Sequence, residues 1–146
     1  MRTVALILTE AGVLRPGFQF RIENPPWMAL VIEDLPARGP SGFRAVSVAH
    51  YGEQNGDLMR DPEMLFEMEL KGGLWRLSPY SWRNDYVGIE QYSRYRDDDG
   101  NLLVLMRRQR QLEEFADLWD NNLRSQGFVE AFQRSRPLSR LCTRPN

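Results

Sequence analysis

A pair of adjacent glycines constrains the fold of this chain more than any other feature. Gly72-Gly73 separates the segment Met64 to Leu70 from the segment Leu74 to Ser78, and apolar residues recur at alternate positions in both. Glycine adopts the positive φ angles that a two-residue turn between antiparallel strands requires. The sequence therefore predicts a β-hairpin with its turn at these two glycines.

The turn also sets the expected register of the hairpin. Three pairs of residues would lie opposite each other: Leu70 with Trp75, Met68 with Leu77, and Glu69 with Arg76. The first two pairs share one face and the third lies on the other, because side chains alternate between the faces of a strand. We expect the apolar face to meet the core and Glu69 to form a salt bridge with Arg76.

Further strands are predicted on both sides of this hairpin. Phe18, Phe20 and Ile22 alternate with polar residues until Pro25-Pro26, whose nitrogens cannot donate to a ladder. The segment Trp27 to Ile32 is apolar at both parities, which predicts a central strand covered on both faces. The other expected strands are Phe43 to Tyr51 and the pair Tyr86 to Arg96 with Leu102 to Leu105, joined by the acidic turn Asp97 to Asn101.

Two longer helices are expected, one near each end of the chain. Thr3 can cap a helix whose apolar residues lie between Val4 and Leu14, and Arg15-Pro16-Gly17 would end it. A second helix is expected from Arg107 to Gln126, followed by Gly127 in the left-handed conformation. Its apolar stripe would lie across the sheet and consists of Leu112, Phe115, Ala116, Trp119 and Leu123.

These elements define an α+β fold, an antiparallel β-sheet of five to seven strands with an N-terminal and a C-terminal helix packed on it. We expect one α+β domain over residues 1–134, ending with a short turn of helix up to about Arg134. Residues 135–146 show no periodic apolar pattern and are expected to form a flexible C-terminal tail. A chain of 146 residues is long enough to bury one core without a disulfide or a metal.

Charge and cysteine content narrow the classes of function. The 19 basic residues are balanced by 20 acids, so the chain lacks the uniform positive charge that is typical of a nucleic-acid binder. The single cysteine, Cys142, cannot form an intrachain disulfide, and no apolar stretch approaches the ~20 residues of a membrane-spanning helix. Thr9-Glu10 end the apolar start of the chain before it reaches the length of a signal peptide. We therefore expect a cytoplasmic protein.

The densest polar segment runs from His50 to Glu63, and we interpret it as a loop between two strands. Such loops commonly carry binding and catalytic residues. Some of its polar residues are expected to have structural roles, because Asn55-Gly56 is a turn dipeptide and Asp61-Pro62 can end a loop. The expected partner-binding surface consists of His50, Glu53, Asp57, Arg60, Asp61, Glu63, Asn84 and Asp85. No catalytic residue, resident metal or cofactor is expected.

The same acids allow a second interpretation, a metal-dependent hydrolase or nuclease. Four residues of the segment are ligand types that suit Mn, Fe or Mg: His50, Glu53, Asp57 and Asp61. Asp61 with Glu69 and Lys71 also resembles the aspartate and Glu-x-Lys pattern of restriction-type nucleases, in which two acids bind Mg²⁺ beside a lysine. The two interpretations differ in whether these acids converge on one point or point outward separately.

A third interpretation is a nucleic-acid-binding module. Aromatic residues that can stack on bases alternate with arginines that can hold phosphates. The aromatic set is Tyr80, Trp82, Tyr86, Tyr92 and Tyr95, and the arginines between them are Arg83, Arg94 and Arg96. Nearby acids, including Asp85, Glu90 and Asp97 to Asp99, offset this positive charge.

The run HYGEQNGDLMRDPEM, from His50 to Met64, resembles a bacterial family described only as a domain of unknown function. The resemblance includes Met28 to Glu33 before this run and Asn84 to Gly88 after it, and it extends from about Phe20 to Phe128. It implies an accessory protein of a plasmid, phage or integrative element, since members are often carried on such elements. Small accessory proteins of this kind often bind host proteins, including components of restriction or CRISPR defence.

The function expected first is therefore a non-enzymatic accessory protein of a mobile genetic element. It would bind a macromolecular partner, first of all a host or element-encoded protein, and inhibition of host defence is one role that the resemblance implies. A metal-dependent hydrolase and a nucleic-acid-binding module stay as alternatives. No membrane partner is expected.

Overall fold

The computed structural model describes residues 1–136 of the chain. Within them lie three helices, α1 (Arg2–Ala11), α2 (Met106–Ser125) and α3 (Phe128–Ser135). The strands are β1 (Gln19–Asn24), β2 (Trp27–Asp34), β3 (Arg44–Gln54), β4 (Asp57–Lys71), β5 (Leu74–Asn84), β6 (Ile89–Tyr92), β7 (Arg94–Arg96) and β8 (Leu102–Val104).

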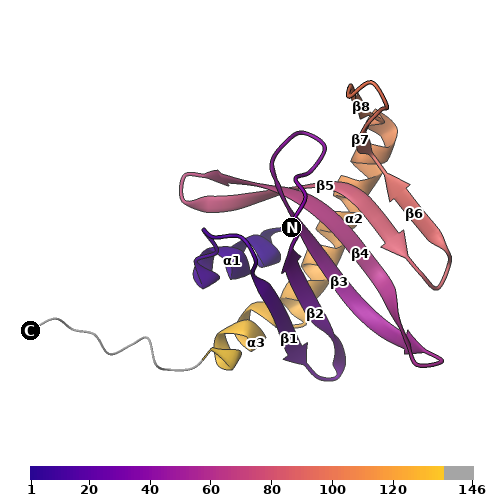
Figure 1. The fold of residues 1–146 in the computed structure, drawn as a ribbon. Helices are drawn as coiled ribbons and strands as arrows, with labels where there is room; N and C mark the ends of the chain where they lie inside the picture. Colours follow the sequence, from indigo (N-terminus) through magenta and orange to yellow (C-terminus); the bar gives the residue numbers. More distant parts are fainter. Residues whose placement is uncertain (137–146) are drawn as a thin grey trace, which may run out of the picture.

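Six strands form one antiparallel sheet in the order β1-β2-β3-β4-β5-β6, so neighbours in the sheet are also neighbours in sequence. β7 and β8 form a separate two-stranded ribbon. The three helices pack on one face of the large sheet and leave its other face free of helices (Figure 1). This architecture confirms the predicted α+β fold, an antiparallel sheet with an N-terminal and a C-terminal helix packed on it.

The Gly72-Gly73 hairpin has the register that the sequence predicts. The observed pairs are Leu70 with Trp75, Met68 with Leu77 and Glu69 with Arg76. Both glycines have positive φ angles, 58° and 77°, as a two-residue turn requires. Met68 and Trp75 are buried in the core and Leu77 packs partly buried against it, as expected. Leu70, next to the turn, is 46% exposed and does not reach the core.

The ion pair of Glu69 differs from the prediction. Its carboxylate lies 3.5 Å from the Lys71 ammonium, two residues along the same strand, and not against Arg76. Residues two apart on a strand share a face, as do residues opposite each other on neighbouring strands. Lys71 and Arg76 are therefore both within reach of Glu69. Both partners are exposed, and such a surface pair contributes little to stability.

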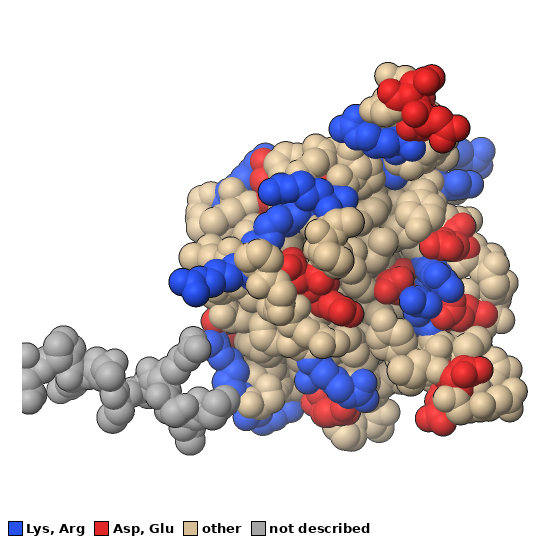
Figure 2. All heavy atoms as spheres, viewed as in Figure 1, with Lys and Arg blue, Asp and Glu red and all other residues tan. Residues whose placement is uncertain are grey.

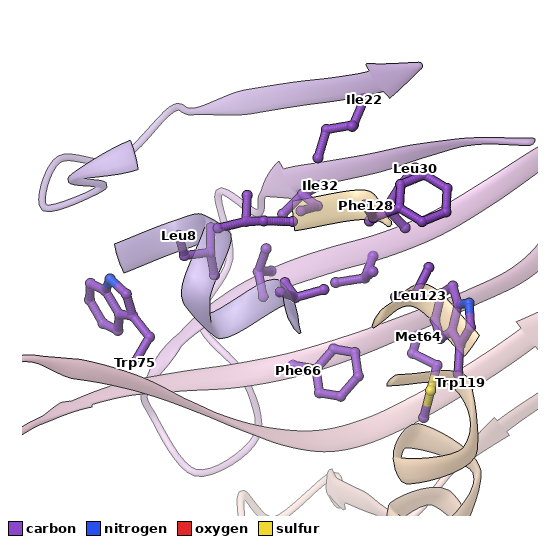
Figure 3. Close-up of a cluster of buried hydrophobic side chains, with 14 of the residues drawn as sticks. Leu8, Ile22, Leu30, Ile32, Met64, Phe66, Trp75, Trp119, Leu123 and Phe128 are labelled. Atoms are coloured by element: carbon purple, nitrogen blue, oxygen red, sulfur yellow. The ribbon is translucent and has the colours of Figure 1, made fainter. Parts of the chain in front are cut away.

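The core lies between the inner face of the sheet and the helices (Figure 3). Successive strands supply Ile22, Leu30, Ile32, Val48, Met64 and Phe66. The helices add Leu8 of α1, Phe128 of α3 and the stripe predicted for α2, which consists of Leu112, Ala116, Trp119 and Leu123 with Phe115 at its margin. The helical period of the sequence therefore identified the buried face of α2 correctly.

Helix α1 begins at Arg2, before the predicted cap, and its N-terminus is capped from another helix. The Thr3 backbone N–H donates a hydrogen bond to Asp120 Oδ1 of α2 at 2.7 Å, and the Thr3 side chain makes no cap. A carboxylate at this end satisfies a free amide and interacts favourably with the helix dipole. The helix ends at Ala11 because Gly12 has a φ of 68°, so Leu14 lies outside it and is exposed.

Strand β2 is an interior strand but not the central one. Leu30 and Ile32 are buried against the helices. Val31 is buried on the helix-free face, where it lies between Arg21 of β1 and Ala49 of β3. Both faces of β2 are thus buried from Leu30 to Ile32, as predicted, and on the helix-free face the cover comes from side chains of the neighbouring strands.

The segment predicted as one strand from Tyr86 to Arg96 is divided. Residues 85–88 form the turn between β5 and β6, and Ser93 separates β6 from β7. Ser93 is buried, its backbone N–H donates to Tyr80 O, and its carbonyl accepts from the Leu105 N–H. Ser93 thereby attaches the ribbon to the sheet, while the predicted pairing of β7 with β8 through the acidic turn is confirmed.

Helix α3 matches the short helix expected up to about Arg134 and continues to Ser135. The guanidinium of Arg136 donates a hydrogen bond to Glu10 O at 2.8 Å and lies 5.5 Å from the centroid of the Phe132 ring. These last two residues, which the sequence assigns to the tail, thus belong to the packed structure. The rest of the expected tail, with Cys142, lies outside the described residues.

Candidate functional site

The segment from His50 to Glu63 is a β-hairpin, so its interpretation as a loop is wrong. Asn55 and Gly56 both have positive φ angles, 54° and 85°, and form a two-residue turn between β3 and β4. Four residue pairs continue the ladder up to this turn: Tyr51 with Arg60, Gly52 with Met59, Glu53 with Leu58, and Gln54 with Asp57. Polar residues are compatible with these two strands because backbone N–H and C=O groups form the hydrogen bonds of the ladder. The sequence feature that favours a hairpin here is the Asn-Gly dipeptide.

The tips of two hairpins lie side by side at one end of the sheet. The β3–β4 hairpin and the β5–β6 hairpin extend beyond the helices toward the lower right of Figure 1. Their contact is direct, since the Asp85 N–H donates to Arg60 O at 2.9 Å. We call residues 51–63 and 83–90 the distal rim.

An ion-pair network occupies the helix-free side of the distal rim. The Glu63 carboxylate accepts a hydrogen bond from the Ser47 hydroxyl at 2.8 Å and lies 3.2 Å from Arg60 Nε. The Asp85 carboxylate accepts from the Arg60 backbone N–H at 2.9 Å and from Arg83 Nε at 2.8 Å, with Arg60 Nη1 3.4 Å away. We call these five residues the rim network. It brings three of the predicted partner-binding residues together.

The hydrogen bonds of the rim network stabilise its charged forms. The bond from the Arg60 backbone amide lowers the pKa of the Asp85 carboxyl most, and the bond from Arg83 lowers it further. The hydrogen bond between Arg83 and Asp85 also raises the pKa of the Arg83 guanidinium. The side chains of Asp85 and Arg83 are 16% and 37% exposed, so both charges also meet solvent.

Two further residues of the predicted surface form a second contact beside this network. Asn84 Nδ2 donates a hydrogen bond to Asp61 Oδ1 at 2.9 Å, and Asn84 Oδ1 accepts from the Tyr86 backbone N–H at 3.0 Å. The Tyr86 ring lies over Gly52, where any larger residue would overlap the phenol oxygen. These contacts hold the two hairpin tips in one arrangement.

His50 lies apart from the other predicted residues, in the core on the inner face. Its Nδ1 is 3.0 Å from Ala29 O, and its ring centroid lies 5.5 Å from that of Trp119 and 5.8 Å from that of Phe128. Burial lowers the pKa of His50, which favours the neutral ring. His50 therefore packs with the core and does not face a partner at the rim.

The candidate metal ligands do not converge. Glu53 and Asp57 are exposed at the tip of the β3–β4 hairpin, while His50 is buried and Asp61 faces Asn84. Residues 1–136 contain no group of three His, Cys, Asp or Glu side chains that could hold a metal ion. Asp61 and Glu69 are eight positions apart on β4, a separation of roughly 25 Å along an extended strand. The acids of the nuclease-like pattern are thus too far apart to share one ion.

The aromatic residues and arginines of the third interpretation do not form one surface. The Trp82 ring packs against Phe115 on the inner face, with ring centroids 5.8 Å apart. Arg94 lies 3.3 Å from Glu67, and the Arg96 guanidinium donates to Pro40 O at 3.0 Å. These guanidinium groups are already paired within the protein, which leaves them poorly placed to bind phosphates.

One buried ion pair, which we call the buried brace, has no signal in the sequence. Glu67 is 3% exposed and Arg94 is 13% exposed. The Glu67 carboxylate accepts hydrogen bonds from the backbone N–H groups of Ser41 at 2.9 Å and Phe43 at 3.4 Å. It thereby anchors the loop between β2 and β3, in which a side chain on Gly39 would overlap Glu67. The partners of Glu67 lie 24 or more residues away in sequence, so no local pattern could reveal them.

The distal rim combines an excess of acid with exposed apolar side chains. It holds the carboxylates of Glu53, Asp57, Asp61, Glu63, Asp85 and Glu90 against the guanidinium groups of Arg60 and Arg83. Acidic side chains are visible on the hairpin tips at the lower right of Figure 2. Leu58 and Val87 are 70% and 61% exposed there, and Tyr86 and Ile89 are also exposed.

The fold and this rim define an α+β domain with one helix-free sheet face and a preorganised polar rim. The chain belongs to the family described as the domain of unknown function DUF6908, whose model matches residues 2–129. No curated protein and no solved structure matches the chain. No helix within residues 1–136 is both long and apolar enough to cross a membrane.

Proposed function

We propose that this chain is a non-enzymatic protein-binding domain that recognises a basic surface of a partner protein through the distal rim. The observation that carries the proposal is the convergence of Arg60, Glu63, Asp85, Asp61 and Asn84 on two adjoining hairpin tips. These contacts order the rim before a partner binds, which lowers the entropy lost on association.

The charge of the rim favours a basic protein over a nucleic acid. Six carboxylates and two guanidinium groups leave this surface negative, and it would repel a phosphate backbone. Arg60 and Arg83 are held by Glu63 and Asp85, so they are engaged within the domain. Complementary charge on a partner would speed association and select the correct surface.

Exposed apolar residues at the same place supply the second property of a protein interface. Leu58 and Val87 project from neighbouring hairpin tips with most of their surface in water. A few apolar anchors inside a polar margin account for most of the binding energy in typical interfaces. Leu58 and Val87 are the anchors that we propose, with the carboxylates around them.

The setting that we propose is a mobile genetic element of a bacterium, where the chain would act as an accessory protein on a host protein or on an element-encoded one. This part rests on the resemblance of the His50 to Met64 run. An inhibitor of host defence is the specific role we favour, with action in the cytoplasm.

The experiment compares two lysine substitutions on one strand. Asp57→Lys places a positive charge at the rim end of β4, and Glu69→Lys makes the matched change near the other end, where the side chain is also exposed. Immobilised wild-type protein is used to capture partners from a lysate of the native host, and the captured protein is then expressed and titrated against each variant. We expect Asp57→Lys to weaken binding by about tenfold or more and Glu69→Lys to change it less than about twofold.

Equal losses in both variants would contradict the proposal, as would a partner whose affinity neither substitution changes. Captured nucleic acid with no protein would favour the nucleic-acid-binding alternative. Melting temperatures of both variants should stay near that of the wild type, because both residues are exposed and form no buried contact.

A further inference from the structure

The β7–β8 ribbon exposes an unusual run of apolar residues. Residues 102–106, Leu-Leu-Val-Leu-Met, are each between 38% and 68% exposed, and Tyr95 across from them is 39% exposed. The ribbon projects from the upper end of the molecule, above the start of α2 (Figure 1). Two strands alone are marginally stable in water, and apolar residues on both faces of such a ribbon call for a further covering partner.

The outer edge of β8 is also free to form hydrogen bonds. Among the described residues β8 pairs with β7 alone. The Leu105 N–H donates to Ser93 O, the Asp97 N–H donates to Asn101 O, and Tyr95 lies opposite Leu103. Because bonded and non-bonded pairs alternate in an antiparallel ladder, Leu102 and Val104 point their N–H and C=O groups away from β7.

We propose that β8 pairs with β8 of a second copy of this chain, antiparallel and centred on Leu103. In this register Leu102 of each copy lies opposite Val104 of the other, so the outward N–H and C=O groups of both residues find partners. Leu103 lies on the two-fold axis. The result is a four-stranded sheet in the order β7-β8-β8-β7, with a self-complementary interface of the kind that two-fold dimers use.

The charges at the two ends of β8 suit this register. The tip before β8 carries Asp98 and Asp99, and the helix after it begins with Arg107 and Arg108. Centring on Leu103 brings the acidic tip of each copy toward the first turn of α2 of the other copy, where we expect Asp99 to lie near Arg107 and Asp98 near Arg108. Figure 2 shows acidic side chains at the tip of the ribbon, with basic side chains directly below them.

The N-terminus of α2 gives a second reason to expect acidic residues of another copy beside it. Leu105 occupies the cap position without a side-chain hydrogen bond, and the first turn contains no acidic residue. Free amide groups and the helix dipole favour negative charge at such an end, whereas this chain places two arginines there. The aspartates of a second copy would supply the negative charge that each α2 lacks.

Apolar side chains of the two copies would also contact one another in the same arrangement. Tyr95 and Leu103 face each other on one side of the ribbon. In the dimer they form a continuous row of Tyr95, Leu103, Leu103 of the second copy and Tyr95 of the second copy. A ribbon of this size offers less than the roughly 800 Å² per partner of a standard interface, so we expect a dimer that dissociates in the micromolar range.

The test is a charge exchange followed by sedimentation velocity from about 1 to about 200 μM protein, the range for a small interface. Asp99→Arg and Arg107→Asp each place like charges opposite one another, and each single variant should be monomeric throughout. An equimolar mixture should dimerise as the wild type does, because each of the two contacts then pairs an arginine of one variant with an aspartate of the other. Asp57→Lys and Glu69→Lys serve as controls and should leave the dimer unchanged, which separates this inference from the proposed function.

Circular dichroism should show that each single variant is folded. A wild-type protein that is monomeric at the highest concentration would overturn the inference. It would also fail if a single variant dimerised like the wild type, or if the mixture of two folded monomeric variants did not dimerise. Amide exchange provides a second measurement, in which Leu102 and Val104 should become protected only as the concentration rises.

Discussion

The helix-free face of the sheet carries two clusters of acids and arginines that differ in burial. In the buried brace, the side chains of Glu67 and Arg94 are 3% and 13% exposed, and backbone amides of a distant loop complete the site. In the rim network, the carboxylates of Glu63 and Asp85 lie at a hairpin junction where Arg60 and Arg83 still meet solvent.

The difference separates a structural role from a recognition role for the same residue types. A buried charge that loses its partner remains without solvation, so the brace must be kept for the fold to persist. At the rim the arginine side chains are 34% and 37% exposed, so each can exchange its partner for water at small cost, and the rim can vary or bind another protein without unfolding the domain. We expect the brace to dominate stability and the rim to dominate binding.

The largest expected effect comes from removing the carboxylate of the brace. Glu67→Gln leaves the Arg94 guanidinium buried without its counter-charge, and the free energy of unfolding should fall by about 3 to 5 kcal/mol. The matched change at the rim is Glu63→Gln, for which we expect a loss of about 1 kcal/mol or less. Urea denaturation of both variants measures the contrast, and similar losses at the two sites would remove the distinction between them.

An intermediate effect on stability is expected from substituting two glycines, one beside the buried brace and one in the distal rim. A Cβ on Gly39 would overlap Glu67, which is held on several sides, so Gly39→Ala should cost about 1 to 3 kcal/mol. A Cβ on Gly52 would overlap Tyr86, whose exposed ring can swing outward, so Gly52→Ala should cost less than about 1 kcal/mol. Thermal unfolding of the two variants should preserve this order, and a larger loss for Gly52→Ala would show that the rim is the more rigid cluster.

A smaller effect, dependent on pH, is expected at Asp85. Its pKa is lower in the folded protein than in the unfolded chain, so its contribution is complete above the ordinary carboxyl value and is lost as pH falls through the lowered value. Asp85→Asn should therefore be less stable than the wild type at neutral pH, by about 1 kcal/mol because the network is open to solvent, and should match it more closely in acid. Urea midpoints measured across this range test the prediction, and a constant difference at every pH would contradict it.

Sequence patterns could predict those parts of the fold that depend on near neighbours. The Gly72-Gly73 register followed from alternation over a few residues, and the buried stripe of α2 followed from helical spacing. The Asn55-Gly56 dipeptide is also a hairpin signal, but the polar residues on either side of it favour a loop. The structure has a hairpin there, which is held by backbone hydrogen bonds. Polar side chains beside a turn are compatible with a ladder whenever neither face needs to enter the core.

Contacts between distant parts of the chain could not be predicted in this way. Asp120 caps α1 across 117 residues, and Glu67 anchors a loop that sequence marks only as rich in proline and glycine. The candidate site shows the same division. The polarity of the sequence identifies Glu63, Arg60 and Asp85 as candidate residues, but their contact depends on the packing of two hairpin tips. His50 lies away from them because its side chain is on the face of β3 that meets the core.

The most direct test of the recognition role is amide hydrogen exchange of the domain with and without its captured partner. We predict slower exchange in residues 53–60 and 84–90, the hairpin tips within the distal rim, and unchanged exchange in the loop residues 39–43 that the brace already holds. Protection confined to the loop, or to a surface away from both hairpin tips, would contradict the assignment of the rim as the binding site.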